Sequence, residues 1–232
     1  GVSVYFSNGT SVNATNTGAN TWTFTVPAGA TTVSITPSFA VSGTTGVPFT
    51  DVPANNFYMQ YVNFVYKHGM MQGDGSSYIF TGNANVTRAQ LVLILYRLSG
   101  SPAVSSYSGF KDVPANAWYS QAVAWASANK IVSGRPGNVF DPGTAVTRQE
   151  FATILYNYNN FRGLGAGNTS NLSQFTDRGY VQSYALNAMQ WAVGNGIISG
   201  TSNTTLSPNG TAIRFQAAAM LTRYCQTFLK MS

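Results

Sequence analysis

The chain has 232 residues, of which 44% are hydrophobic, enough to fill the core of a folded protein. Charged residues make up only 8%, far below the usual quarter or so, which means that uncharged polar residues must cover much of the surface. The formal net charge of +6 favours an anionic partner, and since the basic residues form no run, nucleic acid is the least favoured one.

Residues 1–47 predict a small β segment. Apolar and polar residues alternate in Trp22-Thr23-Phe24-Thr25-Val26 and again in Val33-Ser34-Ile35, which predicts strands. Pro27-Ala28-Gly29 predicts the turn between two of them. A linker rich in Gly, Ser and Thr follows at 40–48. The sequence opens without a signal peptide, so we expect it to be a segment of a longer protein.

The rest of the chain contains three similar units, which we place at 48–108, 109–173 and 174–232. In each unit an aspartate is followed by an aromatic residue that opens a first predicted helix. A glycine comes next, and then an arginine at the start of a second predicted helix. The equivalent residues are Asp51, Phe57, Gly73 and Arg88 in the first unit, Asp112, Trp118, Gly134 and Arg148 in the second, and Asp177, Tyr184, Gly200 and Arg214 in the third.

The second predicted helix of each unit has a cation in its first turn. In the middle unit Thr147 and Glu150 predict a capping box, and Arg148 lies between them, where a cation opposes the helix dipole. One such arginine alone is better explained as a solvated surface residue. Its recurrence in all three units favours an anion site made of free helix-start amides and a guanidinium. On this interpretation Arg148→Ala should cost less than about 1 kcal/mol of stability.

The middle unit shows the whole pattern most completely. It reads Phe110-Lys111-Asp112-Val113, then Trp118-Tyr119, Ile131-Val132 and Thr147-Arg148-Gln149-Glu150, and this closely resembles the S-layer homology motif. The resemblance covers residues 49–229 as three tandem copies. It implies a mainly α fold, with three helix-loop-helix motifs in a pseudo-threefold spindle around a central bundle of the three arginine helices. The small N-terminal β segment precedes it.

The resemblance also implies a function. In this family, grooves between neighbouring motifs bind an anionic secondary cell-wall polysaccharide, often pyruvylated, and the twelve equivalent residues above are the groove positions. The implied role is non-covalent anchoring at the cell wall or S-layer of a Gram-positive bacterium, with peptidoglycan as a further candidate ligand. The sequence predicts no nucleic-acid partner, no cofactor, no metal and no membrane span. We expect a monomer in isolation.

Departures from the motif rank the three units. The first has Phe57 where the family has Trp and Gln90 where it has Glu. The third has Tyr184, Leu206 and, in place of the capping Thr, Ile213. This ranking predicts that the middle unit holds the best site and the third unit the poorest.

The N-terminal strands resemble the last hairpin of β-rich repeats that precede anchoring modules in bacterial surface proteins, which implies a spacer. A truncated sandwich remnant is the alternative. Two alternatives to a simple anchor stay open as well. One is a structural, self-assembling S-layer subunit, and the other is the anchor of an upstream wall-active enzyme.

Catalysis within this chain is not predicted. A glycosidase needs two carboxylates flanking the scissile bond, and the six acidic residues include the three repeat aspartates and the capping Glu150. Asp74 and Asp141 fall in predicted turns, and the Asp74 turn has too few carboxylates for a calcium loop. His68 is expected to cap a helix, and the single Cys225 is expected to be a small buried hydrophobic residue.

Overall fold

The computed structural model describes residues 2–6, 11–13, 15–18, 21–23, 25–26, 28, 33–37, 47–53, 55–73, 78–105 and 108–232. The chain divides into two compact units, Gly1–Pro48 and Phe49–Ser232. Each is described by itself. The Asp74 turn and most of the predicted 40–48 linker lie outside the described residues.

The N-terminal unit is built of short antiparallel strands. They are β1 (Val2–Phe6), β2 (Ser11–Asn13), β3 (Thr15–Gly18), β4 (Thr21–Thr23) and β5 (Val33–Pro37). Strands are therefore present as predicted, and Pro27 and Gly29 of the predicted turn lie outside the described residues, but β4 and β5 do not pair with each other as in the hairpin that the sequence resembles. β4 pairs with β3, while β5 pairs with β1 in a sheet of order β2-β1-β5. The register of β1 and β5 sets Val4 opposite Ile35, so the alternating patterns of the two strands match each other.

The larger unit has one pair of helices in each repeat. The outer helices are α1 (Met59–Lys67), α3 (Ser120–Ala128) and α5 (Leu186–Gly194), and the arginine helices are α2 (Arg88–Leu98), α4 (Arg148–Phe161) and α6 (Arg214–Tyr224). A π-helical turn, Cys225–Leu229, extends α6. Two short 3₁₀ turns, Arg178–Tyr180 and Ser183–Ala185, precede α5. The aromatic residues expected to open the outer helices lie two residues before them, in the preceding turns.

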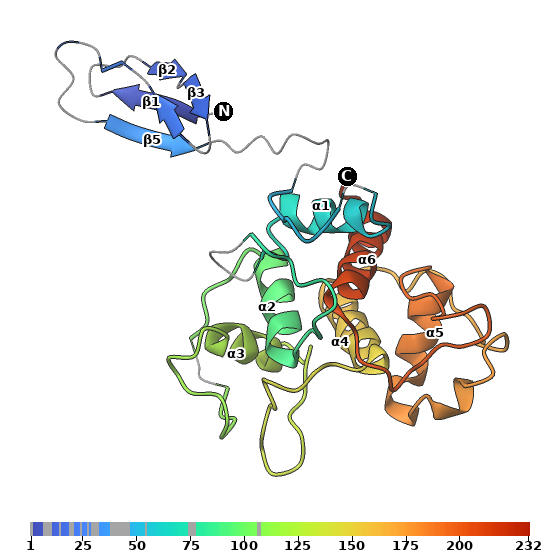
Figure 1. Ribbon diagram of the computed structural model, residues 1–232. Helices are drawn as coiled ribbons and strands as arrows, with labels where there is room; N and C mark the ends of the chain where they lie inside the picture. The colour runs from blue at the N-terminus through green and yellow to red at the C-terminus, as the bar shows by residue number, and fades with distance from the viewer. Residues whose placement is uncertain are drawn as a thin grey trace. The chain divides into compact units, whose positions relative to one another are not determined.

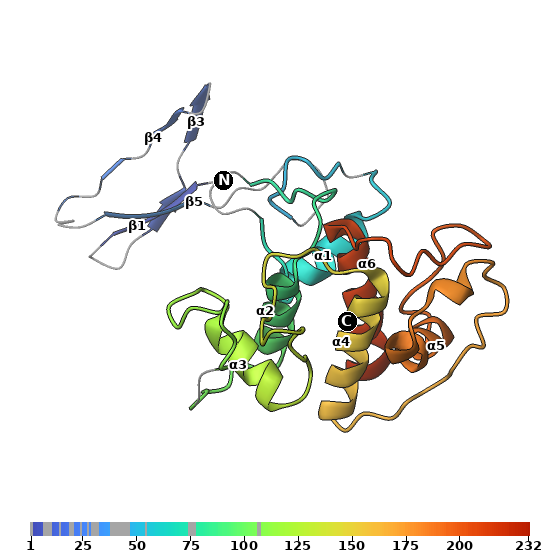
Figure 2. The ribbon, with the colours of Figure 1, turned by 90° about the horizontal axis from the view of Figure 1, so that it is seen from below.

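The three arginine helices form the centre of the larger unit. In Figures 1 and 2, α2, α4 and α6 lie next to one another, and α1, α3 and α5 lie outside them. Leu95, Leu155 and Leu221, one from each arginine helix, are fully buried. The rings of Tyr158 on α4 and Tyr224 on α6 meet at 6.0 Å. This confirms the predicted mainly α fold with a central three-helix bundle.

The helices are exchanged between repeats. α3 of the second unit packs on α2 of the first, α5 packs on α4, and α1 of the first unit closes the cycle by packing on α6 of the last. Three backbone hydrogen bonds repeat this cycle at the start of the bundle. Val86 donates to Ala212, Ala212 to Val146, and Val146 back to Val86, each at 2.9 Å. Each lobe therefore combines the second helix of one repeat with the first helix of the next.

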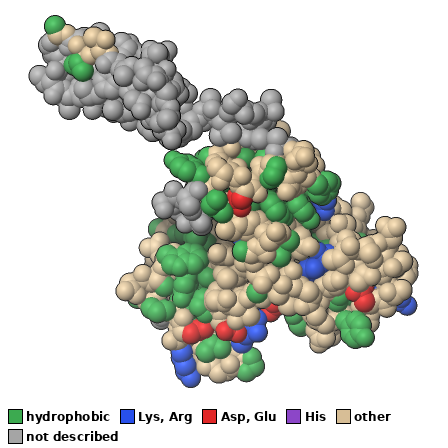
Figure 3. Space-filling model, viewed as in Figure 1, with side chains coloured by type: hydrophobic (Ala, Val, Ile, Leu, Met, Phe, Trp, Pro, Cys, Tyr) green, Lys and Arg blue, Asp and Glu red, His purple; other side chains and the backbone are tan. Residues whose placement is uncertain are grey.

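Local capping signals fix where the inner helices begin. Both Thr147 with Glu150 and Thr87 with Gln90 form capping boxes, which confirms the prediction for α4. Ile213 has no side-chain acceptor, so only the reverse bond remains, from its N–H to Gln216 Oε1 at 3.4 Å. Figure 3 shows few charged side chains on the visible face, in line with the low charge content of the sequence.

Candidate functional site

Each arginine at the start of an inner helix reaches into the following unit and binds its backbone. Arg148 donates through Nε to the carbonyl of Leu206 at 2.9 Å and through Nη2 to the carbonyl of Ser199 at 2.6 Å. The equivalent bonds run from Arg88 to Phe140 and Ser133, and from Arg214 to Phe80 and Gln72. The three arginines thus join the units in the same closed cycle as the helices.

The structure removes the basis for expecting that Arg148 adds little to stability. Its side chain is only 5% exposed, and Arg88 is only 6% exposed. Burial lowers the pKa of both guanidinium groups, because a low-dielectric surrounding disfavours the charged form. Removing either side chain would leave two carbonyl groups of the next unit without their charged donor.

The helix-start amides are also occupied. The N–H of Arg148 donates to the carbonyl of Gly210 at 2.8 Å, and the N–H of Gln149 donates to that of Pro208 at 3.1 Å. The equivalent amides of α2 donate to Thr144 and Pro142, and those of α6 donate to Ala84 and Gly82. The predicted anion site of free amides was therefore wrong, because carbonyl groups of the neighbouring unit already accept from these donors.

The repeat aspartates hold the loop that each arginine reaches. Asp112 accepts from the N–H groups of Phe140 and Asp141, both at 2.7 Å. Asp51 and Asp177 accept in the same way from Phe80 and Thr81, and from Leu206 and Ser207. Burial acts to raise the pKa of Asp112 and Asp177, but these hydrogen bonds outweigh it and leave both pKa values lowered. In each unit, the aspartate thus accepts a hydrogen bond from the N–H of the same residue whose carbonyl group accepts one from the arginine.

The repeat glycines allow a close contact with an aromatic ring. A Cβ on Gly73 would lie 2.9 Å from the Phe49 ring and 2.8 Å from the carbonyl oxygen of Ile79. A Cβ on Gly134 would meet the Phe110 ring, and one on Gly200 would meet Phe175. No side chain fits at these positions without a shift of the loop.

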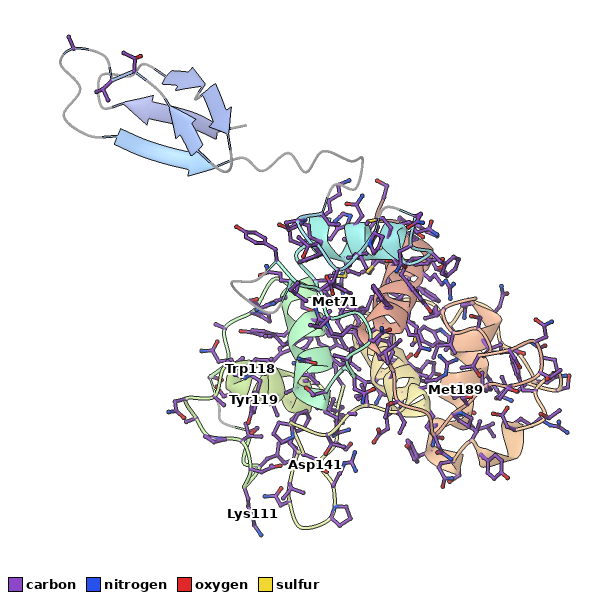
Figure 4. The ribbon with its side chains drawn as sticks, in the orientation of Figure 1. Met71, Lys111, Trp118, Tyr119, Asp141 and Met189 are labelled. Carbon is purple, nitrogen blue, oxygen red and sulfur yellow. The ribbon has the colours of Figure 1, made fainter. Side chains whose placement is uncertain are left out.

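The repeat aromatics, by contrast, are largely free of the core. Phe57 is 66% exposed, Trp118 is 62% exposed and Tyr184 is 58% exposed. Figure 4 labels Trp118 beside Tyr119 at the start of α3. Rings that are so exposed contribute little to the stability of the fold. All three lie just before the start of an outer helix, where they are free to contact a ligand.

One groove brings together site residues from all three units. This α6 groove, of about 280 Å³, is lined by Phe57 of the first unit, Arg148 of the second, and Gly200, Gln216 and Arg223 of the third. A second, the α4 groove, of about 690 Å³, has the equivalent composition. It is lined by Arg88 of the first unit, Gly134 and Glu150 of the second, and Tyr184 of the third.

In both grooves, the arginine of one repeat lies with the glycine of the next repeat and the aromatic residue of the remaining one. A third groove of the same kind would combine Arg214, Gly73 and Trp118. Arg214 donates to the carbonyl of Gln72, next to Gly73, at 2.6 Å. Residues 74–77 of this loop lie outside the described residues. The ranking of sites by repeat stays a prediction, and it has to be applied groove by groove, because Arg148 lines the α6 groove whereas Gly134 of the same repeat lines the α4 groove.

The two grooves differ in charge compensation. In the α4 groove, Glu150 lies 2.9 Å from Arg135 Nη2 and 4.0 Å from Arg88 Nη1. Asp141, which does not line the groove, lies 3.4 Å from Arg135 Nε. Figure 4 labels Asp141 in the loop before α4. The residues that line the α6 groove include two arginines and no acidic residue.

Sequence reasoning missed three groove residues. Tyr58 lines the α6 groove and stacks on Phe215, with ring centroids 5.0 Å apart. Arg135 directly follows the repeat glycine. Arg223 follows Gln216 by seven residues, and this spacing puts Gln216 and Arg223 on the same face of α6. That helical spacing was the available signal for Arg223. The repeat aspartates do not line either of the two grooves; Asp51 lines a separate hollow with Thr81 and Phe215.

His68 and Cys225 have the structural roles expected for them. His68 is the C-cap residue of α1, and its Nε2 lies 3.2 Å from the carbonyl oxygen of Ser232. Cys225 is fully buried beside Met70, and burial raises the pKa of its thiol to about 12. Within the described part of the chain, no helix combines the length and apolar character needed to cross a membrane.

Comparison with known proteins gives three matches to one family model. The model of the S-layer homology domain matches residues 48–92, 109–152 and 174–218, more than half of the chain. Each match spans the aspartate, aromatic, glycine and arginine positions of one repeat.

Several relatives share this region. The chain is 33% identical over 162 residues to a surface-layer 125 kDa protein of Lysinibacillus sphaericus, covering 67% of this chain and 13% of that protein. It is 26% identical over 185 residues to a cellulosome-anchoring protein of Acetivibrio thermocellus, covering 78% of this chain and 39% of that protein. An amylopullulanase of Thermoanaerobacterium thermosulfurigenes is 29% identical over 140 residues, covering 60% of this chain and 7% of that enzyme. The chain therefore spans well under half the length of these relatives.

Proposed function

This chain belongs to the S-layer homology domain family, and from that premise we propose that it anchors a longer, secreted protein to the cell surface without a covalent bond. Its ligand is an anionic secondary cell-wall polysaccharide of a Gram-positive wall, and a pyruvylated sugar is the substituent we favour. One observation carries this proposal. The α6 groove combines two guanidinium groups with an exposed aromatic ring, and none of its lining residues is acidic.

The chemistry of that groove suits an acidic glycan. Arginine binds carboxylates through paired donors, and an exposed ring such as Phe57 offers a flat apolar face beside them. Two relatives are a surface-layer protein and a cellulosome-anchoring protein, and both agree with a role at the extracellular surface. We place the three repeats at 48–108, 109–173 and 174–232, with residues 1–47 as a spacer.

Binding rather than catalysis is the function we assign to this chain. Among the described acidic residues, the three repeat aspartates accept hydrogen bonds from backbone N–H groups. Glu150 caps the start of α4 and forms an ion pair with Arg135. Asp141 pairs with Arg135 at 3.4 Å. An amylopullulanase among the relatives fits an anchor joined to an enzyme elsewhere in the parent protein.

Co-sedimentation with purified Gram-positive wall sacculi tests the proposal. We expect the chain to be retained on intact sacculi and to be lost when the secondary polysaccharide is removed. Retention on stripped sacculi would instead point to peptidoglycan or to non-specific attraction by the basic surface. Since one relative is a surface-layer protein, self-assembly is the second candidate function. Light scattering of the chain alone should show a monomer, and growth of large particles without glycan would favour the lattice.

A further inference from the structure

The α4 and α6 grooves are built from equivalent residues, so their differences are informative. At three of the positions that differ between them, the charge of the side chain changes. Glu150 on α4 corresponds to Gln216 on α6, Arg135 corresponds to Thr201, and Asn157 corresponds to Arg223. All six residues line their respective grooves.

The α4 groove supplies a carboxylate to its own arginines. Glu150 lies 2.9 Å from Arg135 and 4.0 Å from Nη1 of Arg88, the one nitrogen of that guanidinium that donates to no backbone carbonyl. A side-chain carboxylate therefore takes the place that an anionic ligand would need. An anion entering this groove must compete with it.

The α6 groove lacks that carboxylate. Arg148 uses Nε and Nη2 for backbone carbonyls, and its Nη1 has no hydrogen-bond partner among the described residues. Gln216 carries no charge, and its Oε1 accepts from the N–H of Ile213. Arg148 therefore lacks the neighbouring carboxylate that Glu150 provides at the equivalent position of the α4 groove.

Arg223 adds a second cation that no acidic residue compensates. Its guanidinium lies 5.4 Å from the ring centroid of Tyr61, and its hydrogen bonds to Tyr61 and to the carbonyl of Ile197 are long, at 3.4 and 3.5 Å. Long bonds to uncharged partners are readily exchanged for a bond to an anion, which is shorter and about twice as strong.

We propose that Arg223 is a specificity-determining residue that makes the α6 groove selective for glycan segments carrying two acidic groups. One group binds Nη1 of Arg148 and the other binds Arg223, beside the exposed Phe57 ring. The self-compensated α4 groove binds such a segment more weakly. This inference rests on the proposed function, since it specifies the ligand of the same groove.

The test uses acidic polysaccharide released from Gram-positive walls, fragmented and separated by anion exchange into segments with one acidic group and with two. Calorimetry of the full chain measures the affinity for each. Arg223→Gln should weaken binding of two-acid segments by about tenfold or more, and that of one-acid segments by less than about threefold. Arg162→Gln removes an equal charge at an exposed position that lines neither groove and should leave both affinities unchanged.

A gain-of-binding variant tests the same inference from the other side. Glu150→Gln removes the internal carboxylate but keeps a capping residue, since Gln90 and Gln216 occupy the same position on α2 and α6. It should increase the affinity or number of sites for acidic segments. Equal weakening of both segment classes by Arg223→Gln, or the same effect from Arg162→Gln, would overturn the assignment to Arg223. Absence of any binding by the unaltered chain would speak against the proposed function itself.

Discussion

The guanidinium of Arg214 in the last repeat donates through Nε to the carbonyl oxygen of Phe80 in the first, at 2.7 Å and across 134 residues of sequence. Asp51 accepts from the N–H of the same Phe80. One residue of the first unit is thus held from both sides, by its own repeat and by the last one. The guanidinium also lies 4.6 Å from the centroid of the Phe80 ring.

The same arrangement makes the arginines structural residues as well as groove residues. We expect Arg148→Ala to lower the free energy of unfolding by about 2 to 4 kcal/mol, because two carbonyl groups lose a charged donor. Urea denaturation measures the change. Arg162→Ala is the control, since this exposed side chain has one hydrogen bond, to the hydroxyl of Tyr158. Equal losses in the two variants would contradict the role of Arg148.

The glycine contacts predict a second stability effect. Gly134→Ala should destabilise the protein by about 1 to 3 kcal/mol, because the added methyl group meets the Phe110 ring and the carbonyl of Val139. Gly143→Ala is the matched control in the same repeat, since a Cβ there meets no atom within 4 Å. It should be neutral or slightly stabilising. Thermal unfolding of both variants decides the point, and an equal effect would remove the packing explanation.

Acid should weaken the fold through Asp112 and Asp177, whose pKa values are lowered in the folded state. The pKa of Asp177 is lowered in the folded state, so its contribution to stability is complete above the ordinary aspartate value, near 4, and is lost as the pH falls through the lower folded-state pKa. Asp177→Asn should therefore be less stable than the unaltered chain at pH 7, because an amide group cannot accept from both Leu206 and Ser207 through two oxygens. The gap should narrow as the pH falls below 4. A difference that is constant from pH 7 to pH 2 would show that the charge is not involved.

The sequence carried the local part of this structure and missed the part that depends on neighbours. The capping box of Thr147 and Glu150 and the apolar spacing of the inner helices are local signals, and both predicted α4. The exchange of outer helices between repeats is not local, since α1 is paired with α6 from the opposite end of the sequence. Arg148 was misjudged for the same reason: its burial comes from the next repeat, not from its own helix.

The composition of the grooves follows from that exchange. Equivalent positions in three repeats identified the residue types, and the family resemblance placed the grooves between neighbouring units, but neither showed which residues of different units share a groove. The structure puts Phe57 with Arg148 and Tyr184 with Arg88. A cyclic arrangement of units moves each partner by one repeat, and no spacing within a single repeat reports that shift.

The exposed aromatic ring of the α6 groove gives the prediction that best separates binding from folding. Phe57 is 66% exposed, so Phe57→Ala should change the free energy of unfolding by less than about 1 kcal/mol. Binding to wall sacculi should fall several-fold, because the ring lies beside Arg148 and Arg223 in the groove. Tyr180→Ala is the matched control, since Tyr180 is equally exposed at 67% and does not line the groove. Phe57→Trp should retain or strengthen binding, and its fluorescence should respond to the glycan. If Tyr180→Ala reduced wall binding as much as Phe57→Ala, general surface adhesion would explain the retention, and the α6 groove would lose its role.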